Sequence, residues 1–221
     1  MFGMICKTNR KKEAGNVLFL ILVGVMLFGA LSFTVAQMLR TGDAEGVGER
    51  KASVLADEIL AVAHQYRQAV QALRISNGCE DEDISFENST IGGYTHTPVA
   101  SDDCKLFHTD GGGLSYIAPS TEYGDGSDWV FNGANIVDNI GTTAPDLIAI
   151  LPNINLTVCN SINDKMGITA LGNDATIDFS KFTDTYTSTQ TIDFASGFAA
   201  GCLDYVNSGD NYFFYQVLIA R

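Results

Sequence analysis

The pattern of apolar and polar positions differs along the chain, and its first part is an uncharged run. Residues 17–36 contain no Asp, Glu, Lys or Arg over twenty positions. A helix of this length rises about 30 Å at about 1.5 Å per residue, which matches the hydrocarbon thickness of a bilayer. The run therefore predicts a transmembrane helix over residues 16–40, preceded by a short basic leader at residues 1–15.

The second part is amphipathic and follows a glycine-rich segment. Residues 41–48 hold three glycines and two acidic residues, a composition that predicts a break in the helix. The segment from residue 49 to residue 77 has apolar side chains at steps of three and four: Leu55, Ile59, Val62, Tyr66, Val70 and Leu73. This spacing predicts a stalk helix that buries one face in its own domain, with contact to a partner helix as the alternative.

The third part, over residues 78–221, consists of short apolar runs between glycine-rich turn signals. The predicted strands cover residues 84–87, 94–97, 105–108, 114–118, 129–131, 147–151 and 212–220, and a predicted helix covers residues 153–166. The predicted fold class is therefore α+β, with a long N-terminal transmembrane and amphipathic helix followed by a mostly antiparallel β-sheet domain.

Charge is distributed unevenly along the chain. Residues 1–15 carry four Lys or Arg and one Glu, whereas residues 41–221 carry 8 Lys or Arg and 25 Asp or Glu, a net charge of −17. Basic residues beside a membrane segment stay in the cytoplasm, which predicts that the acidic remainder is exported. Because an acidic surface repels phosphates, we expect no direct binding of nucleic acid.

The cysteines agree with an exported domain. Cys6 lies in the leader, and the other four are Cys79, Cys104, Cys159 and Cys202. Four cysteines in an oxidising compartment suggest two disulfides, for which three connectivities are possible. Sequential pairing, Cys79 with Cys104 and Cys159 with Cys202, is favoured because it closes the shorter loops. Free buried thiols are the alternative.

The start of the chain resembles a known family of leaders. The basic residues, the sequence Glu13-Ala14-Gly15 and the apolar run without a polar spacer resemble the leader of type IV prepilins and type II secretion pseudopilins. The resemblance covers the leader, the apolar helix and the stalk helix, about a third of the chain. It implies that a prepilin peptidase cuts between Gly15 and Asn16. Cleavage by a signal peptidase after Ala36 and an uncleaved anchor are the alternatives.

This resemblance implies a structural subunit of a type IV pilus-like or type II secretion pseudopilus-like filament. The implied core positions of the filament are Val17, Leu20, Gly24, Gly29 and Ala30. Most major pilins carry Glu where this chain has Leu20, which implies a minor, tip or initiating subunit.

The resemblance also implies partners and a location. The partners are other pilin-like subunits, the prepilin peptidase, an assembly ATPase and a platform protein. The location is the bacterial inner membrane with a periplasmic C-terminal domain, and a filament after assembly. The alternative function is a single-pass, membrane-anchored periplasmic domain that binds a protein or a glycan.

Catalytic chemistry has little support in the sequence. The three histidines are His64, His96 and His108, and no motif of a nucleophilic hydrolase, a zinc protease or a P-loop accompanies them. Asp102 and Asp103 lie between the last two histidines, but their spacing matches no recognised metal site. We therefore expect that the chain is not an enzyme.

One acidic loop is a candidate calcium site. Asp125 and Asp128 lie close together, with Asp110 and Glu122 nearby in the sequence. Calcium prefers such oxygen ligands, although the EF-hand pattern is absent. The alternative is a solvated turn, and no other cofactor is expected.

Overall fold

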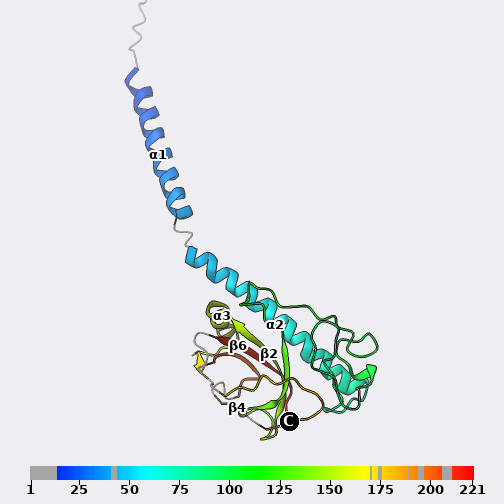
Figure 1. The fold of residues 1–221 in the computed structure, drawn as a ribbon. Coiled ribbons are helices and arrows are strands. Elements are labelled where there is room, and N and C mark those ends of the chain that lie inside the picture. Colours follow the sequence, from blue (N-terminus) through cyan, green and yellow to red (C-terminus); the bar gives the residue numbers. More distant parts are fainter. Residues whose placement is uncertain are drawn as a thin grey trace, which may run out of the picture. The chain divides into compact units, whose positions relative to one another are not determined.

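A computed structural model describes residues 14–40, 44–169, 171–173, 176–188, 190–193, 197–205 and 211–221 (Figure 1). Within α1 the side chains are described for residues 19–34, and within α2 for residue 46 and from residue 48 onward. The chain forms two compact units, Met1–Val47 and Gly48–Arg221, which are treated separately below. Its elements are α1 (Ala14–Arg40), α2 (Ala44–Ser76), η1 (Asp102–Cys104), β1 (Val130–Val137), β2 (Asp146–Ile154), α3 (Leu156–Met166), β3 (Gly172–Asn173), β4 (Gln190–Ile192), β5 (Ala200–Asp204) and β6 (Tyr212–Ile219).

Helix α2 begins earlier than its sequence pattern predicts. It starts at Ala44, so Gly46 and Gly48 are helical and the predicted break over residues 41–48 is too long. Residues 41–43 lie outside the described part. A glycine costs a helix about 1 kcal/mol relative to alanine, which the cooperative helix that continues for 33 residues overcomes.

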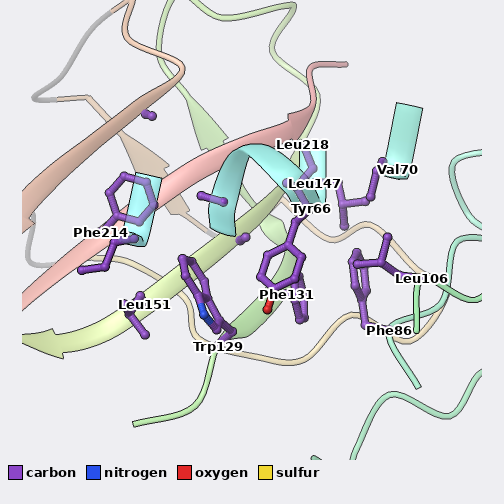
Figure 2. Packing of buried hydrophobic residues seen from close by; sticks show 14 of the residues in the cluster. Tyr66, Val70, Phe86, Leu106, Trp129, Phe131, Leu147, Leu151, Phe214 and Leu218 are labelled. Carbon is purple, nitrogen blue, oxygen red and sulfur yellow. The ribbon is translucent and has the colours of Figure 1, made fainter. Parts of the chain in front are cut away.

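The amphipathic stripe of α2 forms one side of the main core, as predicted. Five of its six predicted positions are buried and Val62 is half-buried. Tyr66 is the centre of the contact, because its ring meets Trp129 edge-on at 5.4 Å and Phe131 at 5.3 Å between ring centroids. Figure 2 shows Tyr66 close to Phe131 of the sheet, and Val70 near Leu147 of the sheet and near Phe86 and Leu106 from the segment that follows α2. The domain's own sheet therefore satisfies the apolar face of α2.

The sheet has six strands in the order β3-β5-β6-β2-β1-β4. The central strands β2 and β6 are almost continuously buried, because both sequences are apolar runs without polar alternation. Such runs are typical of strands that are covered on both faces. On the face opposite α2, a second core packs Ile148, Phe213 and Tyr215 against Ile177 and Ile192. The domain therefore has three layers, with the sheet in the middle.

The predicted fold class is wrong in two respects. The sheet is mixed rather than mostly antiparallel: β1 pairs with β2, β2 with β6 and β5 with β6 in antiparallel fashion, whereas β1–β4 and β3–β5 are parallel. The parallel strands are short and are reached through long connections, which allow the chain to return in the same direction. In addition, none of the helices, as far as the structure describes them, is long and apolar enough to cross a membrane.

The segment between α2 and β1 is irregular, contrary to the strands predicted over residues 84–118. Its ladder contacts are two isolated bridges, one between Ser85 and Lys105 and one between Gly124 and Ile154 of β2. The segment is nevertheless well packed, since Ile84, Phe86 and Leu106 are fully buried. Its apolar side chains are thus buried by turns and loops instead of by strands. Long ordered loops of this kind are uncommon in compact domains and often carry function.

Two disulfides are present, which confirms the predicted sequential pairing of the four cysteines. Cys79 pairs with Cys104 and Cys159 with Cys202. The second bond joins α3 to β5, and the side-chain amide of Asn163 adds two hydrogen bonds of 2.8 Å to the backbone N–H and C=O of Cys202. Helix α3 is therefore fixed to β5 both covalently and by hydrogen bonds.

Candidate functional site

Helix α1 is the candidate functional site, because its apolar side chains have no cover. Leu, Val, Phe and Met dominate its sequence, which contains no proline and no charge between Ala14 and Leu39. Ten large apolar side chains are between 51% and 73% exposed: Phe19, Leu20, Ile21, Leu22, Val25, Met26, Leu27, Phe28, Leu31 and Phe33. A helix that is apolar on every side is normally buried. Among the described residues of its own unit, α1 therefore has no covering surface.

The small residues of α1 leave shallow positions on the helix surface, where no long side chain projects. A Cβ atom added at Gly24 or Gly29 would have no atom within 4 Å, and Ala30 is exposed. Small residues let the backbone of a second helix approach closely. Leu20 is 64% exposed and adds no charge to this surface. These four predicted core positions therefore lie on one apolar helix that is open to contact.

The structure describes the backbone of the predicted cleavage site but not its side chains. Gly15, Asn16 and Val17 fall within the bounds of α1, but their side chains lie outside the described residues. The prediction of cleavage after Gly15 therefore remains a prediction.

The acidic loop proposed for calcium is organised by hydrogen bonds within the protein. The Asp125 carboxylate accepts hydrogen bonds from Ser127 N–H at 2.8 Å and from the Asn153 amide at 2.9 Å, and these bonds hold its pKa below the usual value. Asp128 accepts a hydrogen bond of 2.8 Å from Tyr116. In the described residues, no group of three or more His, Cys, Asp or Glu is arranged to hold a metal ion. Calcium binding stays a prediction that nothing in the fold favours.

The histidines have separate surroundings. His64 shares a 2.8 Å hydrogen bond with Gln68 on the exposed face of α2. His96 is buried edge-on against Phe182 at 5.7 Å, and its burial lowers the pKa of the imidazole. His108 lies 3.8 Å from carboxylate oxygens of both Asp102 and Asp110. None of these arrangements joins a histidine to a serine or cysteine nucleophile.

Sequence reasoning missed one buried acid. Asp146 is fully buried at the start of β2, where its two carboxylate oxygens accept the N–H groups of Val137 at 2.8 Å and Arg221 at 2.9 Å. Burial raises the pKa of this carboxyl, although the two hydrogen bonds oppose the rise. The residue has a structural role, because it ties the end of β1 and the residue Arg221 after β6 to the start of β2, which lies between them. An isolated Asp before an apolar run gives no signal of this role.

Comparison of the chain with families of known proteins, with curated proteins and with solved structures found no match.

Proposed function

We propose that this chain is a structural subunit of a filament of the type IV pilus or type II secretion pseudopilus kind. The observation that carries the proposal is the exposed apolar surface of α1. In such a filament the α1 helices of neighbouring subunits cover one another, and the acidic domain stays in water. The resemblance of the leader to prepilins is the reason for naming this class of assembly.

The energetics of α1 favour association. Burying one large apolar side chain is worth about 1.5–3 kcal/mol. Ten such side chains on α1 therefore represent on the order of 15 kcal/mol before the entropy cost of association is subtracted. Gly24 and Gly29 allow the helices to pack closely enough for dispersion contacts to add to this value.

Leu20 favours a minor, tip or initiating position in the filament. A glutamate in a helix interface requires a partner, such as the N-terminal amine of a neighbour, and this pairing fixes the register of stacked subunits. Leu20 packs without such a partner and imposes no register. A subunit of this kind suits a unique position better than a repeating one.

The disulfides and the acidic surface support export of the domain to an oxidising compartment. Assembly would then follow cleavage after Gly15 by a prepilin peptidase, and it would need an assembly ATPase, a platform protein and other pilin-like subunits. The N-terminal mass of the mature chain tests this order of events. A start at Asn16 supports the proposal, and a start at Gln37 contradicts it.

The decisive test compares two matched variants in purified filaments. Phe28 on α1 and Ile75 on α2 are both large apolar side chains on helices, and they are 73% and 81% exposed. A charge buried between helices without a partner is strongly unfavourable. Phe28→Asp should therefore abolish incorporation, whereas Ile75→Asp should be incorporated like the wild type.

Quantitative mass spectrometry of the filaments gives the readout. We expect this chain at a small fraction of the most abundant subunit. Normal incorporation of Phe28→Asp would contradict assembly through α1, and a dominant copy number would contradict the inference from Leu20. Absence of the chain from every filament preparation would leave the alternative of an exported domain that binds a protein or a glycan.

A further inference from the structure

The irregular segment between α2 and β1 encloses a hollow of about 600 Å³. Its walls come from three stretches of chain, residues 87–90, 105–109 and 113–116. This volume is within the range of about 300–1,000 Å³ that is typical of small-molecule sites. The hollow lies entirely within the unit Gly48–Arg221, whose internal packing the structure describes.

The walls of the hollow are held in place by backbone hydrogen bonds. Leu106 N–H donates to Ser85 O at 2.8 Å, and Gly112 N–H donates to Lys105 O at 3.0 Å. A Cβ atom at Gly111 would collide with the Lys105 carbonyl, so this close approach requires glycine. The Cys79–Cys104 disulfide fixes the stretch that precedes Lys105. The hollow is therefore preformed, which lowers the entropy cost of binding a ligand.

The Asn88 side chain shapes one wall of the hollow through hydrogen bonds to the backbone of its own turn. The Asn88 carbonyl oxygen accepts hydrogen bonds from Thr90 N–H and Ile91 N–H at 2.9 Å, and its amide donates to Phe86 O at 3.0 Å. These bonds fix the turn that carries Ser89 and Thr90. Asn88 therefore shapes the wall and leaves ligand contact to its neighbours.

The charged residues of the hollow disfavour an anionic ligand. Lys105 Nζ lies 3.1 Å from a Glu87 carboxylate oxygen and 2.8 Å from one of Asp102, so its charge is already neutralised. Asp110 adds a further carboxylate beside His108. His108 Nδ1 accepts the N–H of Asp110 at 3.3 Å. Carboxylates thus outnumber the lysine around this site.

The remaining groups combine fixed aromatic rings with hydroxyls. Phe107 and Tyr116 meet edge-on at 5.5 Å, and Phe107 is also held at 5.8 Å from the ring of Tyr66. The Tyr116 hydroxyl donates to Asp128 at 2.8 Å and accepts Trp129 N–H at 3.1 Å, so this ring cannot turn freely. Four lining hydroxyls form no hydrogen bond with any residue that the structure describes: Ser89, Thr90, Thr109 and Ser115.

We propose that this hollow binds an uncharged saccharide. A sugar ring has an apolar C–H face, which packs against aromatic rings such as Phe107 and Tyr116, and hydroxyls around its edge, which match the free hydroxyls of the wall. Glu87 in the wall and the carboxylates of Asp102 and Asp110 beside it disfavour anionic sugars. This proposal does not rest on filament assembly, because it concerns a separate surface of the chain.

A second hollow, of about 320 Å³, is a weaker candidate. It is lined by Phe179, Tyr205 and Phe213 on the other face of the sheet. Its walls include Tyr205 and Asn211, the two residues that flank the undescribed residues 206–210. It therefore serves only as an alternative location in the test.

The test uses the full chain, kept dispersed in detergent because of α1, and saturation-transfer NMR. The probes are the methyl glycosides of glucose, galactose and N-acetylglucosamine, with the methyl glycoside of sialic acid as the anionic counter-probe. We expect at least one uncharged glycoside to bind at millimolar concentration and the sialoside not to bind. Failure of all three uncharged probes, or equal binding of the sialoside, would overturn the proposal.

Matched tryptophan variants locate the site. Thr109 and Thr157 are both exposed threonines, but Thr109 lines the proposed hollow and Thr157 lines a groove between α2 and α3. Thr109→Trp should weaken binding of the uncharged probe at least tenfold, and Thr157→Trp should not. Unchanged binding by Thr109→Trp, or loss of binding by Phe179→Ala alone, would show that the saccharide does not bind in this hollow.

A second variant keeps the test possible if Thr109→Trp does not fold. If Thr109→Trp loses the near-UV circular dichroism of the wild type, Thr109→Val combined with Ser115→Ala replaces it. These changes remove two hydroxyls without adding volume, and they should weaken binding at least threefold. Wild-type affinity in this double variant would count against the proposal.

Discussion

Helices α1 and α2 follow each other in the chain, yet their side chains have opposite surroundings. In α2, apolar residues at steps of three and four are buried against the sheet, and polar residues face water. In α1, no side chain between residues 19 and 34 is buried. A stripe of apolar residues needs only one covering surface, whereas a helix that is apolar all round needs cover on all sides.

This difference separates two uses of the hydrophobic effect in one chain. The stripe of α2 contributes to the stability of the domain. The side chains of α1 that the structure describes are exposed within their own unit, and we propose that this apolar area serves association. Substitutions in α2 should therefore change unfolding, and substitutions in α1 should change assembly.

The largest expected effect tests this separation directly. Tyr66→Ala removes edge-on contacts with three rings and leaves a cavity, which should lower the free energy of unfolding by about 3–5 kcal/mol. Phe28→Ala should change it by less than about 0.5 kcal/mol, because Phe28 is 73% exposed. Urea unfolding of the two variants in detergent measures both values. Equal losses would refute the division of roles between α1 and α2.

The next effect concerns the disulfide at the end of α2. Replacing Cys79 and Cys104 by serine frees a loop with a sequence separation of 25 residues. Loss of this constraint should cost about 3–4 kcal/mol of stability. Thermal unfolding measures the loss against the wild-type chain under the same non-reducing conditions. Wild-type stability of the double variant would show that the bond contributes little.

A pH effect should appear in the domain through His96. Burial holds the pKa of His96 below its usual value, although the carboxylates of Asp184, Asp83 and Glu87 oppose this shift. The unfolded chain therefore binds a proton at a higher pH than the folded chain does. Stability should fall as the pH decreases below the unfolded value of about 6.5, towards the folded pKa.

Unfolding between pH 5 and pH 7 measures this dependence. His96→Gln should flatten it, because glutamine does not titrate. His64→Gln is the matched control, since its imidazole is exposed on α2, and it should keep the wild-type slope. A wild-type slope in His96→Gln would assign the dependence to other groups. No side chain from Ala14 to Leu39 of α1 titrates, and a new α-amine at Asn16 would titrate above pH 7, so incorporation into filaments should not change between pH 5 and pH 7.

The smallest effect is expected on the exposed face of α2. Lys51 Nζ lies 2.9 Å from a Glu122 carboxylate oxygen, but the two side chains are 56% and 54% exposed. Water screens such a pair, so a double-mutant cycle with Lys51→Ala and Glu122→Ala should give a coupling below about 1 kcal/mol. Leu55→Ala, one turn further along α2 on its buried face, should cost about 2–5 kcal/mol. A Lys51–Glu122 coupling energy larger than the stability loss from Leu55→Ala would mean that surface charge, and not apolar packing, holds α2 against the domain.

The elements that sequence reasoning predicted correctly depend on local patterns. The stripe of α2 has a helical period, and β2 and β6 are apolar runs bounded by polar residues. The disulfides followed from cysteine number and loop length. The helix and the strands are determined by residues close together in the sequence, whereas the disulfides join cysteines 25 and 43 positions apart.

The errors arose where distant residues decide the structure. Strand β4 has only three residues, which is too short to show a strand pattern in the sequence. It forms because Gln190 pairs with Asn135, which lies 55 positions earlier in the chain. In the irregular segment, Ile84 and Phe86 have the alternation of a strand but are buried without a ladder. The hollow beside His108 depends on three stretches that meet through such contacts, so no single stretch could predict it.

The amide of Asn163 has a further consequence for the behaviour of this protein at high concentration. Strand β3 pairs with β5 at Leu203 and Asp204, and no residue that the structure describes forms a strand beside Cys202 on the outer edge of β5. An open edge is a template for adding a strand from another molecule. Because Asn163 occupies both backbone groups of Cys202, and the Cys159–Cys202 bond keeps α3 beside them, this position cannot accept a foreign strand. The same residue that fixes α3 thus protects the domain against edge-to-edge aggregation.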